Sequence, residues 1–388
     1  MEKINLEDIP SGNVYVKINK ILIDEIIRFI KKSNTILPEH VKSQLYRMEI
    51  GNKTSLSFLN DFSLNMDIPM VDFQENAELI TSAKFTDVGI KRPNFPINFA
   101  TESGVRFIAA IMGDGELNSQ LNVRYNNQDE SLINIVLNSA RDIFGGVDTK
   151  LYYRTDKTYQ LHFPKIVGIL VSLLGIKSGY KSKTNYGIPT FIFNLNKRLR
   201  AVFIRQFFND EGNVRLKDRR LQVKQTCLIK VSKQRARKNP LKYTHRSLVD
   251  LQKLLASLGI DSKISLGAHR GDRADWELSI YRIENLKRFR KLIDFDVEHK
   301  RELLDLAIKS YKFPSAARNG RLEFALECAK TVQKKHGFIT KQLLAKKSKR
   351  SLKTAMYYLI DLKKNDHVVC TEKPRRNGKP YSHRYIMK

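Results

Sequence analysis

Residues 107–115 read FIAAIMGDG, and residues 204–212 read IRQFFNDEG. In each stretch, apolar residues at helical spacing are followed by an acidic residue and then by glycine. The two acids, Asp114 and Glu211, lie 97 positions apart, which is about the size of one small domain. The same pattern at this separation predicts an internal repeat.

Each stretch predicts a buried helix with a carboxylate at its C-terminal end. The glycine after the acid is expected to end the helix in the left-handed conformation, which glycine adopts without strain. The helix dipole disfavours a negative charge at that end, and two such charges brought together repel each other. A divalent cation between them would keep both ionised. One such helix would indicate an ordinary helix cap, whereas two in register, each followed by a polar alternating segment, indicate a shared site.

Both stretches resemble the LAGLIDADG motif of homing endonucleases, in the form that carries two motifs in one chain. The resemblance places Asp114 and Glu211 at the eighth motif position, which binds metal in the family. It also counts the adjoining Gly113 and Asp210 as part of the metal site. The expected metal is Mg²⁺ or Mn²⁺.

The sequence departs from this motif at two positions. Met112 replaces the first acid of the motif, and Gln206 stands where the second helix usually carries glycine. The larger side chain of Gln206 is expected to widen the helix pair, while Ala109 and Ala110 keep the first helix slim, as close helix packing requires. Neither departure removes the two carboxylates.

The resemblance implies an α+β fold in which two halves, related by a pseudo-twofold axis, each follow the order αββαββα. Residues 98–195 and 196–312 both show helix, strands, helix, hairpin and helix in their hydrophobic patterns. Residues 1–97 predict a helical N-terminal region that begins with a helix over residues 16–32. A DNA-binding module and a plain helical packing domain account equally well for this region.

Residues 321–388 predict a separate unit of three helices and a basic hairpin, which resembles a winged helix-turn-helix. A linker with the sequence PSAA precedes it. A protein-binding winged helix is the alternative, and the many basic residues favour DNA. The side chains expected at the major groove are Ser351, Lys353, Thr354 and Tyr357, and those expected on phosphates are Arg375 and Arg376.

The composition points to a polyanionic partner. The chain of 388 residues holds 70 Lys and Arg against 40 Asp and Glu, which gives a net charge of +30. Basic residues spread through folded segments favour nucleic acid, here double-stranded DNA. An anionic membrane would require a basic amphipathic helix with exposed aromatics or a lipidation signal, and the sequence shows neither. Because no apolar run approaches the ~20 residues that span a bilayer and no secretory signal opens the chain, we expect an intracellular protein that acts as a monomer.

Zinc and disulfide chemistry are not expected. The three cysteines, Cys227, Cys328 and Cys370, are far apart, and the eight histidines contain no His-x-x-x-His pair. Cys328 falls in an apolar helical pattern and is expected in a core.

Phosphodiester hydrolysis needs a nucleophilic water, a neutralised phosphate and support for the leaving oxygen. Divalent metals held by carboxylates supply all three. Magnesium keeps several waters, so two protein carboxylates together with DNA phosphates are enough to hold it. The resemblance implies that each half cuts one strand, which makes a staggered double-strand break.

Members of the family also carry one basic residue per site. Lys183 and Lys300 are the candidates, because each lies 20 residues after the return strand of a predicted hairpin, at Phe163 and Ile280. Lys181 is an alternative to Lys183. Ordinary surface lysines are the competing interpretation in a chain so rich in lysine.

The polar faces of the predicted strands are expected to contact DNA, because an extended sheet can follow the major groove while it contacts phosphates. The candidates in the first half are Arg124, Tyr152, Arg154, Gln160 and His162. The candidates in the second half are Arg215, Lys217, Gln222, Lys224, His269 and Arg270.

Together these features predict a site-specific, metal-dependent DNA endonuclease. The main alternative is a regulator that binds DNA on the same scaffold without cutting it, since a fold does not settle activity. The presence of both Asp114 and Glu211 argues against that alternative. An RNA maturase would use the same surface. An intein is disfavoured, because the ends of the chain lack the Cys or Ser and the His-Asn pair of protein splicing.

Overall fold

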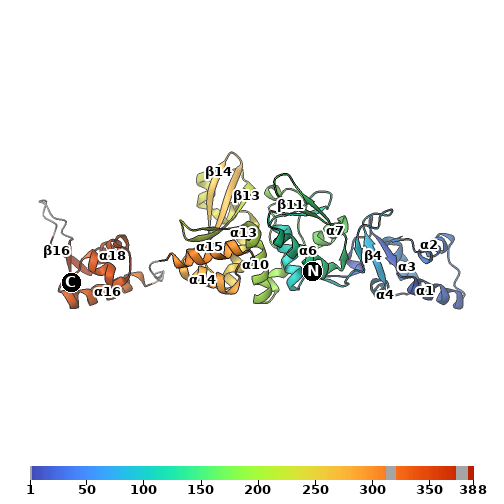
Figure 1. The fold of residues 1–388 in the computed structure, drawn as a ribbon, viewed down its shortest axis with the longest axis horizontal. Helices are drawn as coiled ribbons and strands as arrows, with labels where there is room; N and C mark the ends of the chain where they lie inside the picture. The colour runs from blue at the N-terminus through green and yellow to red at the C-terminus, as the bar shows by residue number, and fades with distance from the viewer. Residues whose placement is uncertain (1, 312–319, 373–382) are drawn as a thin grey trace. The chain divides into compact units, whose positions relative to one another are not determined.

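The computed structural model describes residues 2–311, 320–372 and 383–388 (Figure 1). It contains two compact units, Met1–Tyr281 with Asn285–Ala307, and Arg282–Glu284 with Ile308–Lys388. In the described ranges, no helix is both long enough and apolar enough to cross a lipid bilayer.

The first half of the larger unit builds a four-stranded antiparallel sheet in the order β10-β11-β8-β7. Each strand is short, and helices precede, interrupt and follow the sheet along the chain. In chain order the elements are α5 (Glu102–Met112), β7 (Gly115–Leu117), β8 (Val123–Asn127), α6 (Glu130–Phe144), β10 (Lys150–Tyr153), β11 (Tyr159–His162) and α7 (Lys165–Leu173).

The second half repeats this order, and its sheet runs β14-β15-β13-β12. Matching strands therefore take the same places in both sheets, which confirms the predicted αββαββα arrangement. Two short helices, α8 (Lys181–Thr184) and α9 (Phe191–Asn194), connect the halves. The elements of the second half are α10 (Lys197–Glu211), β12 (Gly212–Arg215), β13 (Arg220–Leu228), α11 (Lys233–Lys238), α12 (Pro240–Tyr243), α13 (Arg246–Ser257), β14 (Ser262–Arg270), β15 (Arg273–Ile280), α14 (Ile283–Leu292) and α15 (Glu298–Lys309).

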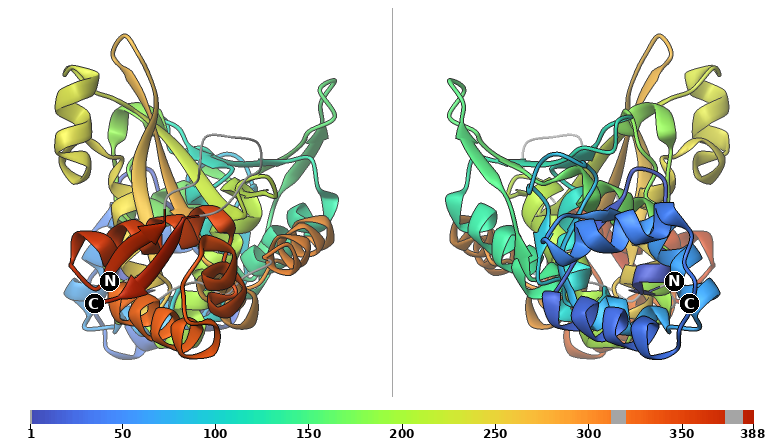
Figure 2. Two further views of the ribbon diagram at one scale, coloured as in Figure 1. Left: turned by 90° about the vertical axis from the view of Figure 1, so that its left-hand side faces the viewer. Right: turned by 90° about the vertical axis from the view of Figure 1, so that its right-hand side faces the viewer.

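Helices α5 and α10 form the centre of the larger unit and pack against each other. Side-chain caps start both: Thr101 Oγ1 accepts from the amide of Gly104, and Asn196 Oδ1 accepts from the amide of Leu199. Eight of the 11 residues of α5 are buried, as expected of a helix that is apolar on most sides. Both sheets lie on one side of the helices, and their hairpins β10–β11 and β14–β15 diverge (Figure 2).

Residues 1–97 mix helices with strands, so the prediction of a helical region is wrong. The predicted helix over residues 16–32 divides at Asn19, whose side chain accepts from the amide of Leu22 and caps α1. Before Asn19, buried Val16 and Ile18 alternate with half-buried neighbours, a period of two that is typical of a strand. The helices are α1 (Lys20–Lys32), α2 (Glu39–Glu49), α3 (Leu56–Met66) and α4 (Met70–Glu75), and the first strands are β1 (Lys3–Ile4), β2 (Tyr15–Ile18) and β3 (Thr54–Ser55).

The N-terminal region and the first half share a sheet. Its order is β3-β2-β4-β5-β9, and β9 (Gly146–Val147) comes from the first half. Lys91 on β5 forms an ion pair with Asp148 just after β9, at 2.9 Å. The remaining strands are β4 (Ala77–Thr81), β5 (Ile90–Lys91) and β6 (Ile97–Asn98), the last of which pairs with β1.

In residues 320–372 and 383–388, the smaller unit shows three helices and two paired antiparallel strands, in the order that the sequence predicts. Thr340 caps the second helix and Ser351 caps the third, each through its hydroxyl. Buried Ala329, Leu344 and Leu362 belong to one apolar core. The elements are α16 (Arg321–His336), α17 (Lys341–Ser348), α18 (Leu352–Lys364), β16 (Val368–Glu372) and β17 (Arg384–Met387).

We expect Gly168→Ala to destabilise the larger unit. A Cβ on Gly168 in α7 would lie 1.8 Å from the carbonyl oxygen of Leu121, which is backbone and cannot rotate away. Overpacking of this kind costs about 1–3 kcal/mol or more, which exceeds the ~1 kcal/mol that alanine gains over glycine in a helix. Urea unfolding checks this. Gly12→Ala is the matched control, because a Cβ there meets no atom within 4 Å; equal stability of the two variants would contradict the packing argument.

Candidate functional site

The two motif glycines provide room for close backbone approach, and the prediction of left-handed helix caps is wrong. Neither Gly115 nor Gly212 has a positive φ, because the chain continues directly into β7 and β12. A Cβ on Gly115 would lie 2.5 Å from Cα of Ile111, and a Cβ on Gly212 would lie 2.3 Å from the carbonyl oxygen of Phe208. Each glycine therefore lets its strand fold back tightly against the preceding helix.

The residues just before the motif acids meet across the helix pair. A Cβ on Gly113 would lie 2.5 Å from Oδ2 of Asp210 and 2.8 Å from its Cβ. Only a residue without a side chain fits opposite Asp210. Gly113 of the first motif and Asp210 of the second therefore fit together, and their contact lets the C-terminal ends of α5 and α10 approach closely.

Asp210 is held by residues from both halves. Burial raises its pKa well above the ordinary value, and the neighbouring Asp114 raises it further. Tyr125 Oη donates to Oδ1 of Asp210 at 2.7 Å, and Gln206 Nε2 donates to the same oxygen at 3.1 Å. Its Oδ2 is buried and has no hydrogen-bond partner in the part of the chain that the structure describes. Burial therefore favours the neutral form of this carboxyl, and Gln206, which departs from the motif, helps to hold it.

Each motif acid accepts a hydrogen bond from an amide side chain of its own half. Asn127 Nδ2 donates to Oδ2 of Asp114 at 2.8 Å, and Gln225 is hydrogen-bonded to Glu211. In both halves the motif glycine pairs with a residue of the second strand, and the amide lies two residues beyond it. The two amides therefore occupy equivalent positions, which the sequence did not single out.

Lys181 and Lys300 lie at the ends of the two motif helices. Lys181 Nζ donates to the carbonyl oxygen of Gly113, and Lys300 Nζ donates to the carbonyl oxygen of Asn209 at 2.5 Å. Of the predicted lysines, the structure thus places Lys300 at the acids. It places the alternative Lys181 there as well, whereas Lys183 is exposed and lies 5.3 Å from the ring centroid of Tyr180.

Burial is the largest influence on the charges of this cluster. It raises the pKa of Asp114, and it raises the pKa of Glu211 from 4.5 to about 7, against the pull of Lys181 and Lys300. It also lowers the pKa of both lysines, while the acids oppose that shift. Each charged group therefore depends on its neighbours to stay ionised.

The backbone of Lys181 is held by the second half. His245 is 1% exposed, and its Nε2 donates to the carbonyl oxygen of Lys181 at 3.1 Å. Its Nδ1 accepts from the amide of Ser247, which makes the other ring nitrogen the donor. Burial lowers the pKa of His245 and so favours this neutral form.

Lys300 is positioned by a cluster around Asp296, just before α15. Oδ2 of Asp296 accepts from Arg106 at 2.5 Å and from Asn209 at 2.8 Å. The amide of Asp296 in turn donates to Oδ1 of Asn209 at 3.1 Å. Because Arg106 belongs to α5 and Asn209 to α10, this one carboxylate ties both helices to the start of the helix that carries Lys300.

Four of the five DNA-contact candidates of the first half form one connected face. Arg124 and His162 are register partners on β8 and β11. His162 Nε2 lies 2.6 Å from Gln160 Oε1, and the ring of Tyr152 lies 4.8 Å from that of His162. Arg154 lies beyond β10, where it pairs with Asp156 at 3.7 Å.

The candidates of the second half are less uniform. Gln222 is buried and Lys224 is exposed, and Lys224 pairs with Glu277 at 3.3 Å. His269 Nε2 donates to the carbonyl oxygen of Val231, so this ring anchors a loop. Arg215 pairs with Asp218 at 3.2 Å, and Lys217 and Arg270 are exposed near turns.

In the smaller unit, the candidates that the structure describes gather at the start of α18. Ser351 caps this helix through Thr354, and Lys353 and Tyr357 are exposed on it. Arg375 and Arg376 lie outside the described residues.

A cavity of about 640 Å³ opens beside the motif acid of the first half and is lined by Gly113, Asp114, Arg124 and Lys181 among others. Within the described ranges, no group of three or more His, Cys, Asp and Glu side chains is placed to hold a metal by itself. The donors at hand are carboxylate oxygens, which suit Mg²⁺ or Mn²⁺, and Mg²⁺ retains waters and takes phosphate ligands. Asp114 and Glu211 therefore fit a cation that is held jointly by protein and nucleic acid.

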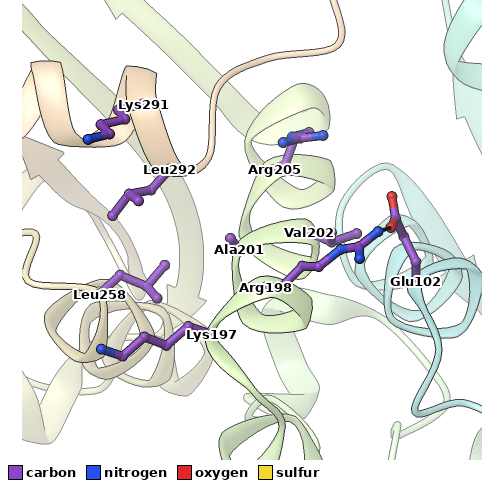
Figure 3. Close-up of a pocket in the computed structure, with 9 residues that line it drawn as sticks. All are labelled: Glu102, Lys197, Arg198, Ala201, Val202, Arg205, Leu258, Lys291 and Leu292. Carbon is purple, nitrogen blue, oxygen red and sulfur yellow. Dashed lines mark hydrogen bonds and ion pairs between the residues drawn. The ribbon is translucent and has the colours of Figure 1, made fainter.

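A second cavity, of about 570 Å³, lies at the N-terminal end of α10, away from these acids (Figure 3). Arg198 donates there to Glu102 at 3.0 Å, and Arg205 Nε donates to the carbonyl oxygen of Ile293 at 2.5 Å. These bonds join the starts of α5 and α10 and fix the loop after α14, so we assign this cavity a structural role.

A family model described as a LAGLIDADG-like domain matches residues 198–294. The probable translation initiation factor IF-2 of Thermococcus kodakarensis is 29% identical over 167 residues, which cover 42% of this chain and 12% of that protein. The tRNA-splicing ligase RtcB of Pyrococcus furiosus is 23% identical over 265 residues, 62% of this chain and 26% of that protein. The chain thus spans about a quarter or less of these relatives.

Among solved structures, the homing endonuclease I-DmoI in complex with DNA and Mn is 19% identical, with a TM-score of 0.34, 50% of this chain and 97% of that chain covered. Full-length DUF199/WhiA from Thermatoga maritima is 12% identical, with a TM-score of 0.34, 68% of this chain and 92% of that chain covered.

We expect Glu211 to make the cation-free protein less stable as the pH rises. The unfolded chain ionises Glu211 near 4.5, while the folded protein keeps the proton until about 7. Stability from this group is therefore full below pH 4.5 and is lost between about pH 4.5 and 7, by on the order of 3 kcal/mol. Unfolding in chelator across this range checks it. Glu211→Gln should flatten the profile and the exposed Glu25→Gln should not; a profile unchanged in Glu211→Gln contradicts the assignment.

Proposed function

We propose that this chain, which belongs to the LAGLIDADG family, is a site-specific, metal-dependent DNA endonuclease that makes a staggered double-strand break. The observation that carries the proposal is the paired construction at the ends of α5 and α10. Each helix end presents one motif acid, and each acid has an amide donor and a lysine beside it. Two equivalent sets of groups suit a reaction that takes place twice, once on each strand.

Asp114 and Glu211 would hold Mg²⁺ or Mn²⁺, which supplies an activated water and neutralises the phosphate when bound. Lys181 and Lys300 favour the ionised form of these carboxylates, against the larger effect of burial, and bring positive charge to the position where the phosphate would gain negative charge. Asn127 and the matching glutamine of the second half fix the orientation of the carboxylates. Burial favours the neutral form of Asp210, and its role is to position the ends of the two helices.

We further propose that double-stranded DNA lies along the two sheets, with the net charge of +30 attracting its phosphates. The connected face of Arg124, Gln160 and His162 would contact base edges and backbone. The smaller unit would act as a winged helix that extends the site through Lys353 and Tyr357. Both motifs are in one chain, so the active form is a monomer.

DNA binding without cleavage is the second candidate. It is favoured by the burial that raises the pKa of both motif acids, because a carboxyl that keeps its proton holds a cation poorly. An RNA maturase would also use this surface. Cleavage, DNA affinity and RNA affinity measured on the same protein distinguish the three functions.

Substitution of the motif acids tests cleavage directly. The substrate is a plasmid library that spans the flanks of the protein's own locus, incubated with Mg²⁺, with Mn²⁺ or with chelator. We expect specific linear product with either metal, and a loss of about 10²–10³-fold or more in Asp114→Asn and Glu211→Gln with DNA binding retained. Asp61→Asn, at an exposed site on α3, is the control. Tight specific binding with no product under either metal would favour the non-cleaving regulator, and specific retention of RNA alone would favour the maturase.

Variants of Lys181 and Lys183 test whether the lysine at the end of α5 takes part in cleavage or is an ordinary surface lysine. Lys181→Met should reduce cleavage by about 10²-fold, because it removes the charge at the end of α5. Lys183→Met should leave the rate within about twofold, because Lys183 is exposed and lies against Tyr180. Single-turnover cleavage of the selected plasmid measures both. Equal reductions in the two variants would remove Lys181 from the site.

A further inference from the structure

The second half contains a folded insertion that the first half lacks. Between β8 and α6 of the first half lie only residues 128–129. Between β13 and α13, at the equivalent place, lie residues 229–245, which form α11 and α12. We call residues 229–245 the basic insertion.

The basic insertion is anchored at several points. Ala236 on α11 is fully buried, and the hydroxyl of Thr244 donates to the carbonyl oxygen of Pro240 at 2.6 Å. Cys227 Sγ donates to the carbonyl oxygen of Tyr243 at 3.3 Å, and His269 on β14 donates to the carbonyl oxygen of Val231 at 3.0 Å. Both helices lie beside β14, the edge strand of the second sheet (Figure 2).

The charged residues of the basic insertion are all positive, leaving aside His245. Residues 229–245 include six Lys and Arg and no Asp or Glu. All six basic side chains are exposed, and none forms an ion pair with an acid in the described part of the chain. They are Lys230, Lys233, Arg235, Arg237, Lys238 and Lys242.

Two basic residues on the neighbouring sheet, by contrast, form ion pairs with an acid. On β13, Arg220 and Lys224 both pair with Glu277 of β15, at 3.6 and 3.3 Å. Arg220 and Lys224 are therefore compensated, whereas no ion pair compensates the six basic side chains of the insertion within the described residues. Like charges held this close repel one another, and an anionic polymer that binds along them relieves the repulsion and releases its own counterions.

The exposed side chains of the basic insertion indicate which class of partner it binds. Leu241 is the one large apolar side chain of residues 229–245 that is strongly exposed, at 61%. A membrane-bound helix or a protein-docking face needs a broader apolar surface. Exposed Lys and Arg without apolar neighbours suit the regularly spaced phosphates of a duplex.

We propose that the basic insertion holds the phosphate backbone of the DNA flank next to the second half, which gives the protein a longer footprint on that side. The inference rests on the DNA binding in the proposed function and does not depend on cleavage. The insertion increases the affinity for DNA and the length of the footprint, while the side chains on the face of the sheet contact the bases and give sequence specificity.

The test removes the four basic side chains of α11 and compares this variant with one that loses four basic side chains elsewhere. The variant carries Lys233→Gln, Arg235→Gln, Arg237→Gln and Lys238→Gln. The control carries Lys165→Gln, Lys177→Gln, Lys287→Gln and Lys291→Gln, four exposed positions outside the insertion. The variant and the control therefore differ from the parent by the same net charge. The probe is a duplex selected from a random pool by binding alone, in the Asp114→Asn background, so that no cleavage is needed.

We expect the salt dependence of binding, as log K against log salt, to become shallower in the variant by about 0.9 for each phosphate that the insertion no longer neutralises, with a smaller change in the control. Hydroxyl-radical footprinting should show weaker protection on one flank only, with the central protection retained. A duplex truncated on that flank should bind the parent and the variant equally.

An unchanged slope and full footprint in the variant would overturn the inference, as would an equal change of slope in the control, since only total charge would then matter. Thermal unfolding establishes that the variant is folded, and Arg237→Gln with Lys238→Gln serves as a milder version if it is not. Failure of the unsubstituted protein to retain any duplex would instead overturn the proposed function, and this inference with it.

Discussion

The close approach of the α5 and α10 ends is the constraint on which the rest of the site depends. Asp210 fits against Gly113 only because that position has no side chain. Tyr125 and Gln206 then hold the same carboxyl from opposite halves. Because the C-terminal ends of α5 and α10 lie side by side, Asp114 and Glu211, which follow Gly113 and Asp210, come into one cluster. Any side chain at position 113 would separate the halves where the proposed chemistry takes place.

Burial sets the electrostatics that this geometry creates. Three carboxyls and two lysines share a poorly hydrated space, and burial disfavours the charged form of each. Because burial favours the neutral form of Asp210, the two lysines are left to offset the ionised forms of Asp114 and Glu211. In the proposed function, an approaching DNA phosphate would add negative charge to this group, and a divalent cation would offset it. In the described part of the chain, no group of three or more His, Cys, Asp and Glu side chains completes a metal ligand set here.

The halves share a topology and differ in how they are supported. The first half joins its sheet to the N-terminal region through β9, and the second half carries the basic insertion. The lysines are also held differently, since Lys181 depends on His245 of the other half, whereas Lys300 depends on the cluster around Asp296. If the proposed function holds, a single chain with unequal halves would suit an asymmetric duplex better than a palindromic one.

The sequence by itself determined the repeat, the two motif helices, their acids and the order of elements, because hydrophobic periodicity and helix ends are local properties of the chain. It favoured Lys183 over Lys181, whereas the structure places Lys181 at the end of α5, where a hydrogen bond from His245 in the other half holds its backbone. It also did not find the matched amides, because Asn127 and Gln225 lie 12 and 13 residues after their motif glycines and become equivalent only through strand pairing. Of the six N-terminal strands, four were missed because they are only two residues long and are defined by distant partners, while β2 was interpreted as part of the helix that follows it. The choice of lysine, the matched amides and the short strands all depend on contacts between residues far apart in the chain. No local sequence pattern indicates such contacts, so these features are known only from the tertiary structure.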